Sequence, residues 1–374
     1  MRRLLEELSG IQSGTQNKAG VDAMAAAIRR AFRDTPFAVE TYPQSLFGDL
    51  LTVSSPACRE TGHILLLGHM DTVFPADTHF TWWREGEGRV NAPGVYDMKG
   101  GLVVGIFAMR ALAAAGRGGD LPIRFVLNSE EEVGSPVSRQ LITTEARKSA
   151  MAFVLEGGGL DGSVVTARKG RWGLRLDVRG RAGHAASAGP NKASAVAALA
   201  HSTLALEGLN RLEPGVSVNV GRVEGGIGPN SVPETGSAEV DVRFVDPAGA
   251  EWFEERLREI LAKPPIPGTS ATVTTVSRRP PMPPVEGNRA LYRLAEAQAS
   301  FLGIPLPEEH RAGVSDANLI AAEGTPVLDG LGPLGDLDHS DREYILVSSL
   351  VERCQLLTLT LEAAGTSLPQ GPWG

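Results

Sequence analysis

Short apolar runs recur along the chain, and their length predicts buried strands rather than helices. The runs are apolar on both faces, and each is followed by a turn or a breaker, which is typical of strands covered on both sides. They are HILLLG (63–68), IRFVLN (123–128), MAFVLE (151–156) and TPVLDG (325–330). Helical spacing of apolar residues lies between them, as in residues 100–116 and 317–324. This alternation predicts an α/β fold whose mixed or parallel sheet is covered by helices.

A different pattern occupies residues 172–280. The runs WGLRLDVRG and SAEVDVRFV alternate apolar and polar side chains, which indicates a sheet with one buried face. With helical segments at 191–209 and 247–263 and two further alternating runs, the order is strand, helix, strand, strand, helix, strand. That is the ferredoxin-like α+β order. We therefore predict a domain at 172–280 that is inserted between two parts of an α/β domain, 1–171 and 281–374.

Composition and charge narrow the class of protein. The chain has 374 residues, of which 42% are apolar and 21% charged, as in ordinary globular proteins. The net charge of −8 argues against a nucleic-acid partner and against an anionic membrane surface. No apolar stretch approaches the roughly 20 residues that span a bilayer.

Two local features bear on the compartment. Cys58 and Cys354 are the only cysteines, too few for a disulfide scaffold. The N-terminal stretch begins with arginines and leucines, but Glu6 and Glu7 interrupt it, so it predicts a helix rather than a signal peptide. We expect a cytoplasmic protein.

Acidic residues and histidines follow the predicted strands. His69 and Asp71 come after the first run, Glu130, Glu131 and Glu132 after the second, Glu156 after the third, and His339 after a glycine-rich loop beyond the fourth. Asp97 precedes the helix at Gly100. Taken alone, it could be no more than the N-cap of that helix. Taken singly, each of these residues could also be an ordinary solvated side chain. Because ligands bind at the carboxyl ends of strands in open α/β sheets, we expect these side chains to converge.

The ligand types indicate which cation could bind there. Histidine nitrogens with carboxylate oxygens, and no cysteine, suit Zn²⁺ or another divalent ion such as Co²⁺ or Mn²⁺. One carboxylate could bridge two ions about 3.5–4 Å apart. No ligand role is assigned to the remaining histidines outside the motifs, which are His63, His79, His201 and His310.

Several motifs resemble those of one enzyme family. GHMDTV, YDMKGG, EEVGS, LEGG, GRAGHAA and DHSDREY are similar in order and spacing to the M20 metallopeptidases, over nearly the whole chain. That family includes glutamate carboxypeptidases, aminoacylases, and acetylornithine and succinyl-diaminopimelate deacylases. The resemblance implies a zinc-peptidase-like catalytic domain with an inserted dimerisation or lid domain.

The resemblance also implies roles for the acidic residues. Glu131 would be the general base, and Asp71 the partner that orients His69. One zinc ion would be held by His69, Asp97 and Glu132, and the other by Asp97, Glu156 and His339, so that Asp97 bridges them. Glu130 has no implied role, and we interpret it as a solvated neighbour.

Residues on the substrate side are implied in the same way. His184 would reach the active site of the partner subunit and polarise the scissile carbonyl, and Asn230 would contact substrate. A free carboxylate is best recognised by arginine, whose donors form a fixed fork. Arg279 is the first candidate and Arg243 the second. The segment GVSDAN, with Gly313 and Ser315, resembles a loop that lines the substrate pocket, although Val314 and Ser315 depart from the usual Gly-Thr.

These features predict a dizinc metallohydrolase that cleaves an amide bond beside a free carboxylate. Its type would be a carboxypeptidase that releases a C-terminal amino acid such as glutamate from a small peptide. An N-acyl amino acid deacylase is the alternative enzyme, and a member that binds peptides or folate-like ligands without turnover is the alternative from another class. We expect a homodimer whose interface uses residues 191–209.

Overall fold

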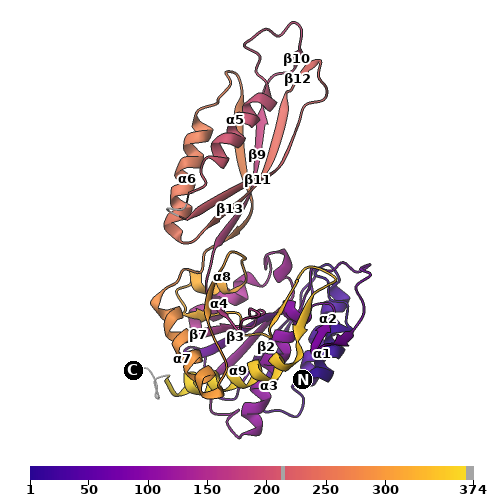
Figure 1. Ribbon diagram of the computed structural model, residues 1–374, viewed down its shortest axis with the longest axis vertical. Coiled ribbons are helices and arrows are strands. Elements are labelled where there is room, and N and C mark those ends of the chain that lie inside the picture. Colours follow the sequence, from indigo (N-terminus) through magenta and orange to yellow (C-terminus); the bar gives the residue numbers. More distant parts are fainter. Residues whose placement is uncertain (212–214, 368–374) are drawn as a thin grey trace. The chain divides into compact units, whose positions relative to one another are not determined.

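The computed structural model describes residues 1–211 and 215–367, and the chain divides into two compact units (Figure 1). Unit 1 comprises Met1–Ala167, Pro284–Arg311 and Ser315–Gly374, and unit 2 comprises Arg168–Pro283 and Ala312–Val314. The predicted insertion, 172–280, lies within the long segment of unit 2. The short segment at 312–314 was not anticipated, because nothing in its sequence distinguishes it from the surrounding α/β region.

Unit 1 is built on a six-stranded mixed sheet with the order β1-β2-β6-β3-β7-β16. Its strands are β1 (Ala38–Tyr42), β2 (Leu50–Ser54), β3 (His63–His69), β6 (Ile123–Asn128), β7 (Ser149–Val154) and β16 (Val327–Leu328). The four apolar runs form β3, β6, β7 and β16, which pair in parallel, and every residue of β3 is buried. Their carboxyl ends therefore meet at one edge of the sheet.

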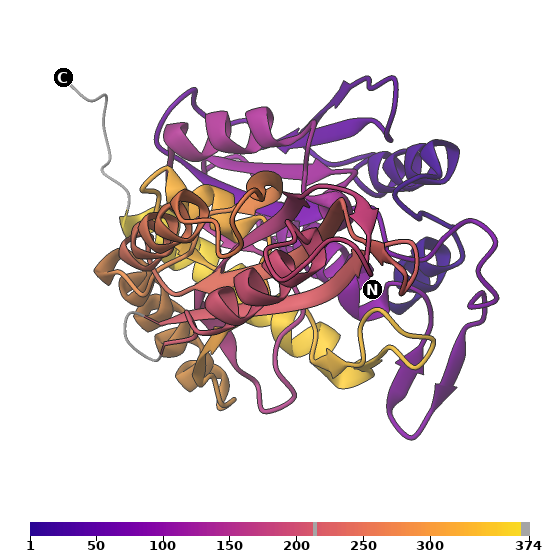
Figure 2. The ribbon, with the colours of Figure 1, turned by 90° about the horizontal axis from the view of Figure 1, so that it is seen from above.

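Helices lie on both faces of this sheet, as predicted (Figures 1 and 2). They are α1 (Arg2–Ser9), α2 (Lys18–Ala31), α3 (Gly100–Ala114), α4 (Arg139–Lys148), α7 (Glu286–Leu302), α8 (Ala317–Ala322) and α9 (Val347–Ser367). Helix α3 packs against both β3 and α9, which explains why it is apolar nearly all round. At Gly101 a Cβ would lie 1.8 Å from the Leu155 carbonyl oxygen, so glycine is required for the start of α3 to approach the end of β7.

Two small sheets complete unit 1. One has four short strands in the order β17-β18-β5-β4, namely β17 (Gly335–Asp336), β18 (Tyr344–Leu346), β5 (Arg89–Asn91) and β4 (Arg84–Gly86). The other pairs β8 (Val164–Arg168) with β15 (Glu308–Arg311). The strands of the first sheet are only two or three residues long, too short for the hydrophobic pattern to have predicted them.

Unit 2 contains a four-stranded antiparallel sheet in the order β11-β13-β9-β14. Its elements in chain order are β9 (Gly170–Arg179), α5 (Ala195–Glu207), β11 (Val216–Gly225), β13 (Thr235–Phe244), α6 (Pro247–Ala262) and β14 (Ser270–Arg279). The order and pairing match the ferredoxin-like arrangement predicted from alternation. Trp172, Phe244 and Phe253 form edge-to-face contacts beneath the helices. A short pair, β10 (Gly183–His184) with β12 (Ser231–Val232), extends beyond the sheet.

Within 1–211 and 215–367, no helix combines the length and apolar character needed to cross a bilayer.

Candidate metal centre

The predicted acidic and histidine residues of unit 1 gather at the carboxyl edge of its sheet. His69 is the last residue of β3, and Glu156 follows β7. Glu131 and Glu132 lie in a single turn, η2 (Glu131–Val133), after β6. Asp97 comes from an irregular helical segment, η1 (Val95–Lys99), that precedes α3.

Asp97 lies between the two histidines. Its Oδ1 is 3.0 Å from His69 Nε2, and its Oδ2 is 3.1 Å from His339 Nε2. Each carboxylate oxygen therefore faces a different imidazole. This is the geometry expected of a carboxylate that is shared between two cation sites.

The two remaining candidate ligands, Glu156 and Glu132, lie near different histidines from those that the sequence predicted. Glu156 Oε1 lies 3.8 Å from His69 Nε2, whereas Glu132 Oε2 lies 3.4 Å from His339 Nε2. The geometry favours the opposite partition from the predicted one, in which Glu132 was grouped with His69 and Glu156 with His339. Strand β3 lies between β6 and β7, so residues following either neighbour could reach His69, and only the loop conformations decide which one does.

One further candidate ligand was missed by the sequence. Asp97, Asp338 and His339 form a second group whose ligand atoms lie within 4.8 Å of one another. Burial and the charge of Asp97 raise the pKa of Asp338. Its position directly before His339 was the only signal available.

Asp71 contacts both His69 and the turn that carries Glu131 and Glu132. The ring atom His69 Nδ1 lies 3.1 Å from the Asp71 carbonyl oxygen and 3.3 Å from its Oδ1. The same carboxylate accepts hydrogen bonds from the backbone N–H groups of Glu131 and Glu132, at 3.1 and 3.3 Å. A proton on Nδ1 would be shared with Asp71, which leaves the Nε2 lone pair directed at the cation position. Asp71 thus orients both His69 and the turn that carries the glutamates.

Glu130 is not the solvated neighbour that we predicted. It is fully buried, and its Oε1 accepts hydrogen bonds from the backbone of Val137 and Ser138 at 3.1 and 2.6 Å. Its Oε2 accepts a hydrogen bond from the Ser129 hydroxyl at 2.8 Å. The carboxylate therefore closes the loop around η2, so the three consecutive glutamates occupy three different environments.

The electrostatics show a cluster with excess negative charge. Burial and the charge of Asp97 raise the pKa of Glu132 to about 7. Hydrogen bonds to Asp97 and Glu132 raise the pKa of His339 to about 11. Burial lowers the pKa of His69, but hydrogen bonds to Asp71 and Asp97 outweigh burial and raise it well above its ordinary value. Protons on these groups compensate carboxylates that would otherwise repel one another.

The donor set fits divalent cations. Imidazole nitrogens and carboxylate oxygens without thiolates suit Zn²⁺, Co²⁺ or Mn²⁺. Glu132 Oε1 is buried and has no hydrogen-bond partner among the residues that the structure describes, which is costly unless another group occupies that position. Metal binding would displace the protons that Glu132 and His339 hold because their pKa values are raised. Two groups sharing Asp97 could therefore hold two ions.

The predicted substrate residues of unit 2 fall into separate places. His184 and Asn230 lie together, because Ala185 N–H donates to the Asn230 carbonyl oxygen at 3.0 Å beside the β10–β12 pair. The His184 side chain is exposed, and its Nδ1 accepts a hydrogen bond from Ala186 N–H at 3.2 Å. In a neutral ring the proton then resides on Nε2.

The two candidate arginines differ in their surroundings. Arg243 forms an ion pair with Asp241, with 2.6 Å between Nε and Oδ1, and also donates to the Ala312 carbonyl oxygen at 3.0 Å. Arg279 lies at the end of β14 and is 5% exposed. The interactions of Arg243 leave its fork engaged within unit 2.

The predicted pocket loop is also anchored. In unit 2 the Gly313 carbonyl oxygen accepts a hydrogen bond from Arg168 Nη1 at 3.1 Å. In unit 1 Ser315 is buried, and its hydroxyl donates to Asp329 at 2.8 Å. The Ser315 hydroxyl is thus committed to the packing of unit 1.

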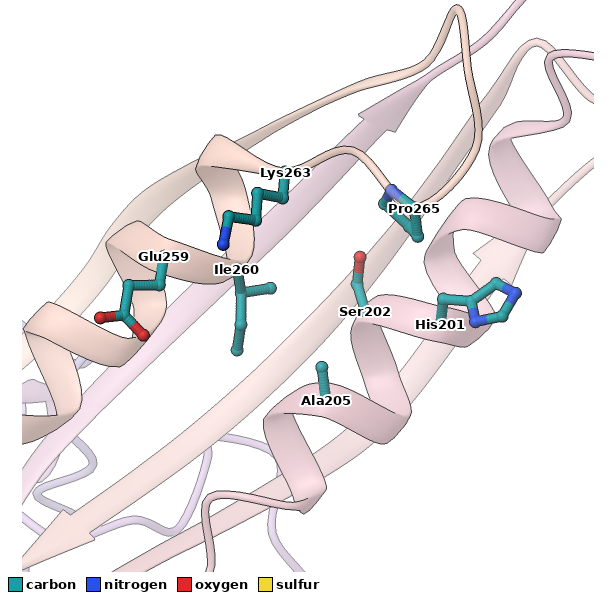
Figure 3. Close-up of a pocket in the computed structure, with 7 residues that line it drawn as sticks. All are labelled: His201, Ser202, Ala205, Glu259, Ile260, Lys263 and Pro265. Carbon is teal, nitrogen blue, oxygen red and sulfur yellow. The ribbon is translucent and has the colours of Figure 1, made fainter.

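A pocket in unit 2 lacks comparable chemistry. It has a volume of about 260 Å³ and lies between α5 and α6, where it is lined by His201, Glu259 and Lys263 among others (Figure 3). The His201 imidazole points away from Glu259. Across the described part of the chain, groups of His, Cys, Asp and Glu with metal-binding geometry occur only at the centre in unit 1.

Sequence comparisons relate this chain to known proteins. Residues 65–363 match the sequence profile of Peptidase family M20/M25/M40. Carboxypeptidase G2 of a Pseudomonas species is 26% identical over 359 residues, which cover 94% of this chain and 86% of the relative. Human aminoacylase-1 is 25% identical over 308 residues, which cover 75% of this chain and 74% of the relative.

A solved structure has the same fold over its whole length. The YXEP protein of Bacillus subtilis, a dinuclear metal binding peptidase from the M20 family, superposes with a TM-score of 0.72 at 14% identity. The alignment covers 98% of this chain and 99% of the other.

Proposed function

Because this chain belongs to peptidase family M20/M25/M40, we propose that it is a two-metal carboxypeptidase that cleaves an amide bond beside a free carboxylate. The released residue would be a C-terminal amino acid such as glutamate. The observation that carries the proposal is the convergence of His69, His339, Glu132 and Glu156 on Asp97, with Glu131 held beside them by Asp71.

The residues around the centre would have separate chemical roles. Two bound Zn²⁺ ions, or Co²⁺ or Mn²⁺, would polarise the scissile carbonyl and lower the pKa of a water molecule. Glu131 would accept a proton from the attacking water on its carboxylate and pass it to the leaving amide nitrogen. Its neighbour Glu132 faces His339 and binds instead, so adjacent glutamates take different tasks. Asp71 fixes the positions of both glutamates by accepting hydrogen bonds from their backbone N–H groups.

Residues of unit 2 would contact the substrate. With Nδ1 accepting from Ala186, His184 carries its proton on Nε2 and can donate it to the carbonyl oxygen of the scissile amide. Asn230 lies next to His184 and could bind the same part of the substrate. Arg279 remains the proposed carboxylate clamp, because the planar guanidinium of an arginine can present two parallel donors to a carboxylate.

We also propose that the protein is a cytoplasmic homodimer in which His184 serves the partner's centre. Exposed apolar side chains on α5 and at the edge strand β11 support an interface there, with Leu204 73% and Val223 51% exposed. A point variant such as Leu204→Glu should be monomeric in analytical ultracentrifugation and should lose turnover. A monomer with the wild-type turnover number would refute the role of His184 across the interface.

An N-acyl amino acid deacylase is the second candidate, supported by the similarity to aminoacylase-1. Both enzymes would use the same base and metal ligands, and they differ in the acyl group that they accept. A member that binds peptides or folate-like ligands without turnover is disfavoured by the complete set of ligands and by Glu131.

The deciding experiment uses protein loaded with Zn²⁺ or Co²⁺. N-acetyl amino acids, dipeptides and a pteroyl-glutamate conjugate are offered, and the released amino acid is quantified. Release of glutamate or aspartate from bulky acyl groups supports the carboxypeptidase, whereas release only from acetyl groups identifies the deacylase. No release with two ions bound per chain would refute both enzymatic proposals.

A further inference from the structure

Glu343 is a buried carboxylate within the motif DHSDREY to which the sequence analysis assigned no role. It has no exposed surface and lies four residues after His339. Its Oε1 accepts hydrogen bonds from the backbone N–H groups of Tyr96 and Asp97, at 2.8 and 2.9 Å. Its Oε2 accepts a third from Gly94 N–H at 2.9 Å. All three donors belong to the segment that presents Asp97.

The backbone of this segment is irregular and needs such an acceptor. Asp97 has φ −118° and ψ 95°, and Met98 has φ −129° and ψ 35°, both outside the helical region. Gly94 has φ +71°, where glycine is favoured. A regular helix would supply carbonyl acceptors from its own preceding turn, but here a carboxylate distant in sequence supplies them. The conformation at Asp97 therefore depends on Glu343.

Both cation positions depend on Asp97, because its Oδ1 faces His69 and its Oδ2 faces His339. A small rotation of the Asp97 backbone would misplace both oxygens together. We propose that Glu343 is a positioning residue whose three-donor clamp holds Asp97 in the orientation that bridges the two ions. The inference rests on the proposed two-metal centre, but not on the identity of the substrate.

The clamp also links Asp97 to His339. The segment from His339 to Glu343 supplies both a ligand and the clamp, and Asn91 Nδ2 fixes it by donating to the carbonyl oxygens of Asp341 and Glu343 at 3.1 and 2.6 Å. His69, by contrast, ends the buried strand β3, and Glu156 follows β7 of the same central sheet. The ion nearer His339 should therefore depend more on Glu343 than the ion nearer His69.

The test measures metal affinity separately from activity. Glu343→Gln keeps the shape of the side chain but replaces one acceptor oxygen with an NH₂ group that faces backbone donors. Chelator competition with Zn²⁺ should show both ions bound more weakly than in the wild type, the ion nearer His339 by about 10–100-fold and the ion nearer His69 by less. Excess Zn²⁺ should restore much of kcat, because Glu131 is intact.

A matched control is Glu145→Gln, which alters another buried carboxylate of unit 1 that pairs with Arg124 and His63 rather than with the Asp97 segment. It should lower the melting temperature of the metal-free protein without changing Zn²⁺ affinity. Wild-type Zn²⁺ affinity in Glu343→Gln, or equal losses of affinity in both variants, would overturn the proposal. Fewer than two ions per wild-type chain would instead refute the two-metal centre itself.

Discussion

The carboxyl edge of the unit 1 sheet and the open face of the unit 2 sheet both gather charged side chains, but they balance charge differently. In unit 2 each acidic residue on that face has an arginine beside it. The pairs are Arg171 and Arg243 with Asp241, Arg175 with Asp177, and Arg222 with Glu224 and Glu239. In unit 1 the carboxylates of Asp97, Glu132 and Glu156 face two histidines.

This difference separates an acidic cluster that is part of the protein's own ion pairing from one that requires a ligand. Burial and the charge of Asp97 raise the pKa of Glu132 to about 7, because both disfavour the charged carboxylate. Burial also raises the pKa of Asp241, but Arg243 and Arg171 outweigh burial and lower it below its ordinary value. The pKa of Glu132 is thus raised where that of Asp241 is lowered, and the following predictions test the difference in charge balance between the two regions.

Removing metal should have the largest effect, and only on unit 1. Dialysis against a chelator should abolish turnover and lower the free energy of unfolding, by about 4 kcal/mol when the wild-type ion concentration was a thousandfold above Kd. Differential scanning calorimetry with and without Zn²⁺ measures this change. If chelation left the melting temperature and turnover unaltered, the acidic cluster of unit 1 would need no bound cation, like that of unit 2.

Glu131→Gln should reduce kcat by about 10²–10⁴-fold, because the amide cannot accept the proton from water. Its backbone N–H still donates to Asp71, so two ions per chain should remain bound. Steady-state kinetics with metal analysis of the same sample measures both. Full activity with two ions bound would exclude Glu131 as the base.

Low pH should lower the free energy of unfolding through Glu145, whose carboxylate pairs with His63 and Arg124. Burial raises the pKa of Glu145, but the hydrogen bond from His63 and the charge of Arg124 lower it overall. The unfolded chain therefore binds this proton more readily than the folded one, so the stabilisation is complete above the ordinary pKa of about 4.5 and is lost as pH falls through the lower folded value. Urea unfolding between pH 3 and 6 should show a smaller pH dependence for Glu145→Gln than for the wild type.

The smallest effect is expected in unit 2. Asp241→Asn should lower the free energy of unfolding by about 1 kcal/mol, as for partly exposed ion pairs, with Zn²⁺ affinity unchanged. Denaturant titration with Zn²⁺ competition tests both statements. Loss of a metal ion in this variant would contradict the inference that the ion pairs of unit 2 are independent of metal binding.

The hydrophobic pattern predicted the central strands, since β3, β6, β7 and β16 are apolar runs whose burial overrides other preferences. The convergence of His69, Asp97 and His339 followed from parallel pairing together with the family resemblance. The partition of Glu132 and Glu156 did not, because it depends on loop conformation on either side of β3.

Buried charge was the main failure of sequence reasoning. Glu130 was predicted to be solvated and Glu343 was given no role, yet both are fully buried acceptors of backbone N–H groups. Their donors lie in irregular loops whose conformation no local pattern encodes. Carboxylates of this kind become recognisable only when the backbone groups that need an acceptor are known.

The short segment 312–314 changes how the inserted region could be excised. Because Ala312 and Gly313 supply carbonyl acceptors to Arg243 and Arg168, a fragment cut at the ends of 168–283 would leave two guanidinium groups without these partners. The polypeptide thus enters unit 2 twice, so this region is discontinuous in sequence. Transplanting it to another scaffold would require a grafted tripeptide as well as the long segment.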